Sequence, residues 1–147
     1  MVILRKLLFI LAFFPSVIFA HKVNLEDKSL EEIVNKRMAL MMEIKSTSTQ
    51  MYRIIQSNDY ETILELNTTL LNAASEFKNY YPEGSQHKSA SDEIWNDRET
   101  FNNFNDKFVN DIEMISLSIE LEDNKMLNDA FKEMAANCGS CHKKFRN

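Results

Sequence analysis

The chain has 147 residues, with 17 basic and 22 acidic side chains and a formal net charge of −5. This length gives room for one domain. An acidic chain without a basic stripe is a poor candidate for binding nucleic acid or an anionic membrane surface. Only two glycines and two prolines occur in the sequence, which favours long helices over frequent sharp turns.

The first twenty residues have the pattern of a secretory signal peptide. Residues 5–6 are basic, residues 7–14 form an apolar run, and Ala20 is the small residue expected before a cleavage site. A membrane anchor is the alternative, but the apolar run is short for spanning a bilayer and Pro15 follows it directly. We therefore expect residues 1–20 to be cleaved and the protein to be exported to the periplasm. Loss of the two basic residues lowers the net charge of the mature chain, residues 21–147, from −5 to −7.

Four later stretches carry apolar residues at the spacing of amphipathic helices, and none shows the sustained alternation that is typical of strands. The first opens at Ser29 with the capping-box pattern Ser-Leu-Glu-Glu. The second runs from Tyr60 to about Tyr80, and the third starts at residues 91–93. The fourth carries its apolar stripe up to Phe145. Because the connections are short or moderate, this pattern predicts an all-α protein, an antiparallel four-helix bundle.

Arg37 and three methionines stand out on the first helix. The arginine either packs its stem while its head reaches water or pairs with an anion, such as a haem propionate. Met38, Met41 and Met42 can all be core filler, although Met41 alone shares the face of Arg37 and the other two point to the flanks. His87, in the polar loop after the second helix, is a further candidate ligand, but a lone histidine in such a loop is usually solvated.

Both cysteines of the chain lie in the stretch Cys138-Gly139-Ser140-Cys141-His142. The C-x-x-C-H spacing is typical of covalent haem attachment. On a helix, Cys138, Cys141 and His142 can all face one flat ligand. The two thiols can then form thioethers with the porphyrin vinyl groups, and His142 can bind the iron as its proximal ligand.

Other uses of a C-x-x-C pair fit this chain less well. A redox dithiol of the thioredoxin type belongs to a βαβ context, and a structural zinc site usually takes four clustered cysteine or histidine ligands. The chain has no further cysteine and no strand pattern. A local disulfide is the remaining alternative. We therefore predict one covalently bound haem c on the core-facing stripe of the last helix.

With this motif on the last of four helices, the sequence resembles the class II c-type cytochromes, the cytochrome c-prime family. The resemblance covers about residues 30–147 and rests on three matching stretches: Arg37 to Met41, residues 81–85 followed by 93–95, and residues 138–146, which include the motif. It implies a four-helix bundle that holds one haem c. The chain departs from the family at residues 91–92, where Ser-Asp precedes Glu93 and a proline is common. We expect this departure to alter only the entry into the third helix.

The family divides according to the residue that faces the iron opposite the proximal histidine. Members with an apolar residue there are five-coordinate and are associated with binding of nitric oxide or carbon monoxide, whereas members with a methionine are six-coordinate, low-spin electron carriers. Met41 falls on this position. The resemblance therefore implies an electron-transfer protein without enzymatic activity, with His142 and Met41 on the iron. A five-coordinate, gas-binding protein is the alternative.

Further expectations concern the surroundings of the haem and the partners. Arg37 is expected to contact a haem propionate, and Arg146, four residues after His142, to lie on the proximal side. The acidic net charge predicts a redox partner protein with a basic docking patch. The resemblance also implies that a homodimer can form through the first two helices. No interaction with nucleic acid, or with a membrane after cleavage, is expected.

Overall fold

The computed structural model describes residues 25–147, so the predicted signal peptide lies outside the described residues. The described chain folds into four long helices, a 3-10 turn and one short helix: α1 (Leu30–Ile54), α2 (Tyr60–Phe77), η1 (Lys78–Tyr80), α3 (Glu93–Asn96), α4 (Arg98–Glu120) and α5 (Asn124–Phe145). The only β-type pairing within these residues is an isolated bridge between Ala90 and Arg146. Among residues 25–147, no helix is long and apolar enough to cross a bilayer.

Each long helix begins at a residue whose side chain accepts a hydrogen bond from the first turn: Ser29, Asp59, Asp97 and Asp123. These caps satisfy backbone N–H groups that have no partner within the helix. The predicted capping box at Ser29 is confirmed, because Ser29 accepts from the backbone of Glu32 while the Glu32 carboxylate accepts from the backbone of Ser29.

The third predicted helix is divided in the structure. Helix α3 ends at Asn96, and α4 starts at Arg98 on the other side of Asp97. The backbone of Asp97 leaves the helical region, with φ −125° and ψ 60°, and its carboxylate accepts from the N–H of Thr100. A side-chain cap at Asp97 therefore starts a new helix where the sequence pattern predicted a continuous one.

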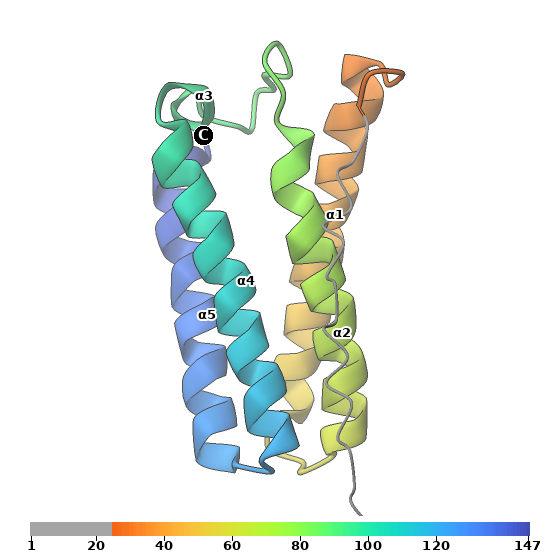
Figure 1. The fold of residues 1–147 in the computed structure, drawn as a ribbon, viewed down its shortest axis with the longest axis vertical. Coiled ribbons are helices and arrows are strands. Elements are labelled where there is room, and N and C mark those ends of the chain that lie inside the picture. The colour runs from red at the N-terminus through yellow and green to blue at the C-terminus, as the bar shows by residue number, and fades with distance from the viewer. Residues whose placement is uncertain (1–24) are drawn as a thin grey trace, which may run out of the picture.

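The four long helices alternate in direction along the bundle (Figure 1). Helix α1 packs on α2, α2 packs on α4, and α4 packs on α5. These contacts bury a core that includes Ile63, Leu70, Phe101, Ile112 and Leu127. Helices α1 and α5, by contrast, make few direct backbone contacts. The predicted antiparallel four-helix bundle is confirmed, and its α1–α5 side is the least closed.

Candidate haem site

The C-x-x-C-H motif lies in the last two turns of α5, on the side that faces α1. Cys138 and Cys141 are half-buried free thiols, and His142 is exposed. All three side chains line a cavity of about 270 Å³, which we call the inner cavity. The structure therefore brings both predicted thioether positions and the predicted proximal ligand to one space.

The wall of the inner cavity is mostly apolar. It is formed by side chains from α1, α2, α4 and α5, among them Ile44, Phe77, Phe104, Phe108, Phe131 and Met134. A second hollow of about 420 Å³, the outer cavity, opens nearer the C-terminus. The two cavities share Met41, Lys45, Phe77, Cys141 and His142, so they are parts of one continuous site.

Met41 faces this site from the opposite side, on α1. Its side chain is half-buried and lines both cavities together with His142. Met38 and Met42 are 45% and 70% exposed and line only the outer cavity. The helical phase inferred from the sequence therefore agrees with the structure, in which Met41 is the one of these three methionines that lines the inner cavity. Whether its sulfur binds iron stays a prediction.

Arg37 lies one turn before Met41 and is almost completely buried, with 4% of its surface exposed. Its guanidinium donates to the Ser85 carbonyl oxygen at 2.7 Å and to the Ser85 hydroxyl at 3.2 Å. It also lies 4.6 Å from the centre of the Tyr81 ring. Burial lowers the pKa of Arg37 from its ordinary value, and the charge of Tyr81 opposes that shift.

No carboxylate among residues 25–147 forms an ion pair with Arg37, although the side chain lines the outer cavity. A buried cation without an anionic partner is costly. The contacts to Ser85 and Tyr81 compensate part of that cost, and a haem propionate in the outer cavity can compensate more. Arg37 is therefore well placed for the predicted propionate contact, which stays a prediction.

Arg146 also lines the outer cavity, four residues after His142. Its backbone pairs with Ala90, and the last residue, Asn147, donates its side-chain amide to the carbonyl groups of Lys88 and Ala90. These contacts fix the end of the chain beside His142, the predicted proximal ligand. Desolvation at the cavity wall lowers the pKa of His142, and the positive charge of Arg146 lowers it further, so the imidazole is held in the neutral form that can bind iron.

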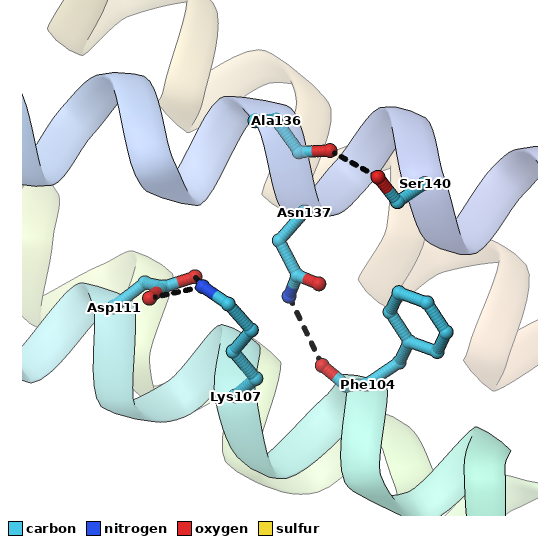
Figure 2. Close-up of polar contacts among 6 residues, drawn as sticks. All are labelled: Phe104, Lys107, Asp111, Ala136, Asn137 and Ser140. Atoms are coloured by element: carbon cyan, nitrogen blue, oxygen red, sulfur yellow. Dashed lines mark hydrogen bonds and ion pairs between the residues drawn. The ribbon is translucent and has the colours of Figure 1, made fainter.

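A buried asparagine fixes the cysteine-bearing part of α5 against α4. Asn137 directly precedes Cys138, is 5% exposed, and donates to the backbone carbonyl of Phe104 at 3.0 Å. Figure 2 shows this contact between the two helices, whereas the bonds of Ser140 to Ala136 and of Lys107 to Asp111 run along single helices. The Phe104 ring lines the inner cavity, so Asn137 couples the position of the motif to the cavity wall.

The two thiols have raised pKa values. Burial is the main cause for both, and it raises the pKa of Cys141 to about 11. The negative charge of Asp111 adds to the shift at Cys138, and that of Cys138 adds to the shift at Cys141. Unpaired, protonated thiols beside an apolar cavity suit thioether formation with a haem better than thiolate binding of a metal ion. No group of three or more His, Cys, Asp or Glu within residues 25–147 is arranged to hold a metal ion.

The sequence analysis missed several residues that line this site. Lys45, four residues after Met41, lines both cavities, and Phe104 and Phe108 supply much of the α4 wall. The helical spacing of Lys45 from Met41 was the available signal. His87 lines neither cavity and contacts the hydroxyl of Ser89 instead.

The residues that line the cavities suit a haem chemically. The apolar inner cavity can hold the porphyrin ring, and the outer cavity offers Arg37, Lys45 and Arg146 for the propionates. No Asp or Glu among the described residues lines either cavity. The residues present therefore fit a haem attached through Cys138 and Cys141.

Comparisons with known proteins agree with this fit. A family model described as Cytochrome C' matches residues 32–146. A nitric oxide complex of a leucine-to-valine variant of cytochrome c prime from Alcaligenes xylosoxidans is 22% identical, with 83% of this chain and 99% of that chain covered and a TM-score of 0.77. Cytochrome c' from Rubrivivax gelatinosus is 17% identical, with 82% and 98% covered and a TM-score of 0.75.

No curated protein matches the chain. The solved structures are less than 25% identical and support the fold. The family model, by contrast, spans most of the chain, including both sides of the haem site. The chain therefore belongs to the cytochrome c' family of class II c-type cytochromes, which carry one covalently attached haem c.

Proposed function

We propose that this protein is an exported haem protein that binds nitric oxide or carbon monoxide at its iron. The observation that carries the proposal is its membership of the cytochrome c' family together with the nature of its structural neighbours, several of which are nitric oxide or nitrosyl complexes. In this proposal Cys138 and Cys141 hold the haem, and His142 binds the iron from the proximal side.

Electron transfer is the second candidate function, and the position of Met41 favours it. If Met41 and His142 both held the haem iron, the bound group would supply electron exchange with little rearrangement of these two residues. The comparisons give no support to a methionine-ligated, low-spin subgroup. The half-buried side chain of Met41 nevertheless lines both cavities with His142, and its flexibility lets the sulfur move without displacing α1.

The two functions compete for the same coordination position. The bound haem supplies an iron that either takes up a gas molecule or exchanges an electron. The chain supplies the neutral imidazole of His142 and an apolar wall that limits access of water. It also supplies the Met41 side chain, which either leaves the sixth position to a gas or occupies it. In neither case does the proposal give the protein an enzymatic activity.

Exposure of the reduced protein to carbon monoxide, together with three methionine variants, decides between the candidates. If the gas-binding proposal is correct, the ferric wild type is high-spin at neutral pH and the ferrous form binds carbon monoxide rapidly with a large spectral change. If Met41 is a stable ligand, the wild type is low-spin and resists carbon monoxide. In that case Met41→Leu converts the protein to a high-spin form that binds the gas.

Met38→Leu and Met42→Leu are the matched controls, because both side chains are exposed at the rim of the outer cavity. Neither substitution is expected to change the spectrum. If the spectrum changed only in Met38→Leu or only in Met42→Leu, that methionine would be the iron ligand in place of Met41, and the electron-transfer function would be retained. A haem stain of the denatured protein checks covalent attachment independently, because only a thioether-linked haem remains with the chain.

We further propose that Arg37 contacts a haem propionate, that Arg146 supports the proximal side, and that the protein is periplasmic after cleavage behind Ala20. The family is usually periplasmic, which supports the last point. Mass spectrometry of the protein from the periplasmic fraction gives its N-terminus directly. Sedimentation tests the proposed homodimer.

A further inference from the structure

Charge is distributed unevenly between two faces of the bundle. The fully charged side chains that line the haem cavities are all basic: Arg37, Lys45 and Arg146. Lys143 is also exposed and lies three residues before Arg146 at the end of α5, a spacing that places the two residues on one side of the helix. Within residues 25–147, none of these four takes part in an ion pair. The two propionates of a haem offset two of these charges, so the mouth of the site keeps a positive excess.

Carboxylates gather on a different face, between α4 and α5. A hollow of about 400 Å³ there is lined by Asp111, Asp123, Asp129 and Glu133, with Lys125 as the only basic residue. The acidic net charge of the chain therefore does not describe the surface around the haem. Because Coulomb interactions between exposed charges are screened within about 10 Å, a docking partner responds to the local charge more than to the total.

The basic rim also carries exposed apolar side chains. Met38 and Met42 are 45% and 70% exposed on α1 and line the outer cavity with Lys45 and Arg146. A small apolar patch with charges around it suits a transient encounter, in which charge steers the approach and a modest contact area permits rapid release. Either candidate function needs such encounters, because a gas-binding haem also has to be reduced.

We propose that this rim, formed by Met38, Met42, Lys45, Lys143 and Arg146, docks an electron-exchange partner protein that presents acidic side chains. The proposal rests on the haem being bound in the cavities but not on the identity of the sixth ligand. It assigns to the partner the charge opposite to that expected from the net charge of the chain. The acidic α4–α5 face takes no part in this docking.

Voltammetry of the haem-loaded protein at an ionic strength of about 0.1 M, where the screening length is about 10 Å, tests the proposal. The probes are two gold electrodes, one coated with a carboxylate-terminated monolayer and the other with an ammonium-terminated monolayer. The carboxylate surface stands in for the acidic partner. We expect faster electron exchange on this surface, despite the net negative charge of the protein, and we expect added salt to slow the exchange.

Lys143→Glu and Lys125→Glu form a matched pair, because each reverses one exposed lysine on α5 and neither lysine lines a haem cavity. We expect Lys143→Glu to slow exchange on the carboxylate surface by roughly threefold or more, and Lys125→Glu to change it by less than about half of that. The absorption spectrum is expected to stay the same in both variants.

Faster exchange on the ammonium surface, or equal effects of the two substitutions, would overturn the docking proposal. So would the absence of a voltammetric wave on both surfaces. A haem stain of the same denatured sample shows whether the docking proposal alone is wrong or the haem site as well. A positive stain confines the failure to the docking surface, whereas a negative stain means that the haem site itself has failed.

Discussion

The position of α1 next to the loop after α2 lets a single side chain of α1 contact both the loop and the outer cavity. Arg37 is the clearest case, because its guanidinium donates to both the hydroxyl and the carbonyl of Ser85. It also stacks on Tyr81 and lines the outer cavity. One side chain thus holds the loop in place and is proposed to offer its positive charge to a haem propionate.

Arg37→Leu is expected to separate these two roles. Loss of the buried hydrogen bonds should lower the free energy of unfolding by about 1–3 kcal/mol. Loss of the cation should lower the reduction potential, because the reduced haem carries one more negative charge. It should also raise the pKa of the propionate and thereby move the pH dependence of the potential to higher pH. Potentiometric titration of variant and wild type measures both shifts.

Ser85→Ala provides the control for this substitution. It removes the hydroxyl that Arg37 contacts but keeps the backbone carbonyl and the positive charge. The variant should lose some stability while its potential follows the pH dependence of the wild type. An Arg37→Leu protein whose titration matches that of the wild type would contradict the propionate contact.

The thiol of Cys141 gives a pH-dependent signal in the haem-free chain. Burial raises its pKa from 9.0 to about 11. Alkylation by iodoacetamide requires the thiolate, so its rate should rise with a midpoint near pH 11 in the folded chain and near 9 in urea. Because the folded pKa is the higher one, this thiol stabilises the fold below about pH 9, and that stability is lost as the pH rises towards 11. A midpoint near 9 without urea would contradict the burial.

Prediction from the sequence succeeded at the residue level where helical periodicity alone decides the answer. The position of Met41 relative to Met38 and Met42 follows from the 3.6-residue repeat, and the structure places it accordingly. The contact between Arg37 and Ser85 could not be predicted in this way. The two residues are 48 positions apart, and the contact depends on the path of the loop that contains Gly84, whose φ is +81°.

At the scale of the helices, features that depend on local sequence patterns were also predictable, whereas features that depend on tertiary packing were not. The start of α1 was predictable because the capping box at Ser29 is a local pattern. The break at Asp97 had a local signal as well, an aspartate three residues before Thr100, but the apolar stripe continues across it and hides the interruption. The weak contact between α1 and α5 has no local signal, since it depends on how all four helices pack.

Asn137 links α5 to α4 through one buried hydrogen bond, and its removal should therefore be costly (Figure 2). Asn137→Ala leaves the inter-helix contact to Phe104 unmade and should lower the free energy of unfolding by about 1–3 kcal/mol. Urea unfolding of the haem-loaded protein measures the loss. We also expect a small shift of the absorption bands, because the neighbouring Cys138 is a predicted attachment point of the haem.

Ser140→Ala is the matched control for Asn137→Ala. Ser140 lies three residues further along α5, is exposed, and contacts only the carbonyl of Ala136 within its own helix. Its substitution should change stability by no more than about 0.5 kcal/mol. Equal losses in the two variants would show that the effect comes from α5 itself and not from its contact with α4.

Three pairs of neighbouring helices in the bundle pack directly on each other: α1 with α2, α2 with α4, and α4 with α5. The two cavities lie on the remaining side, between α1 and α5. Half-buried side chains of the cavity wall, such as Phe104 and Phe108, gain stability only when an apolar partner covers them. A haem in these cavities covers them from within. The haem is therefore expected to be part of the core of the protein as well as its functional group.

Removal of both thioether positions tests this structural role. A Cys138→Ala/Cys141→Ala protein can bind haem only reversibly, so its stability should depend on free haem, and without added haem its melting temperature should fall by about 5 °C or more. A single Cys138→Ala variant, which keeps the Cys141 thioether, should melt between the two and retain the haem stain on a denaturing gel. Calorimetry of the three proteins provides the comparison. If the doubly substituted chain melts at the wild-type temperature without haem, the α1–α5 side is stable by itself and the haem contributes only function.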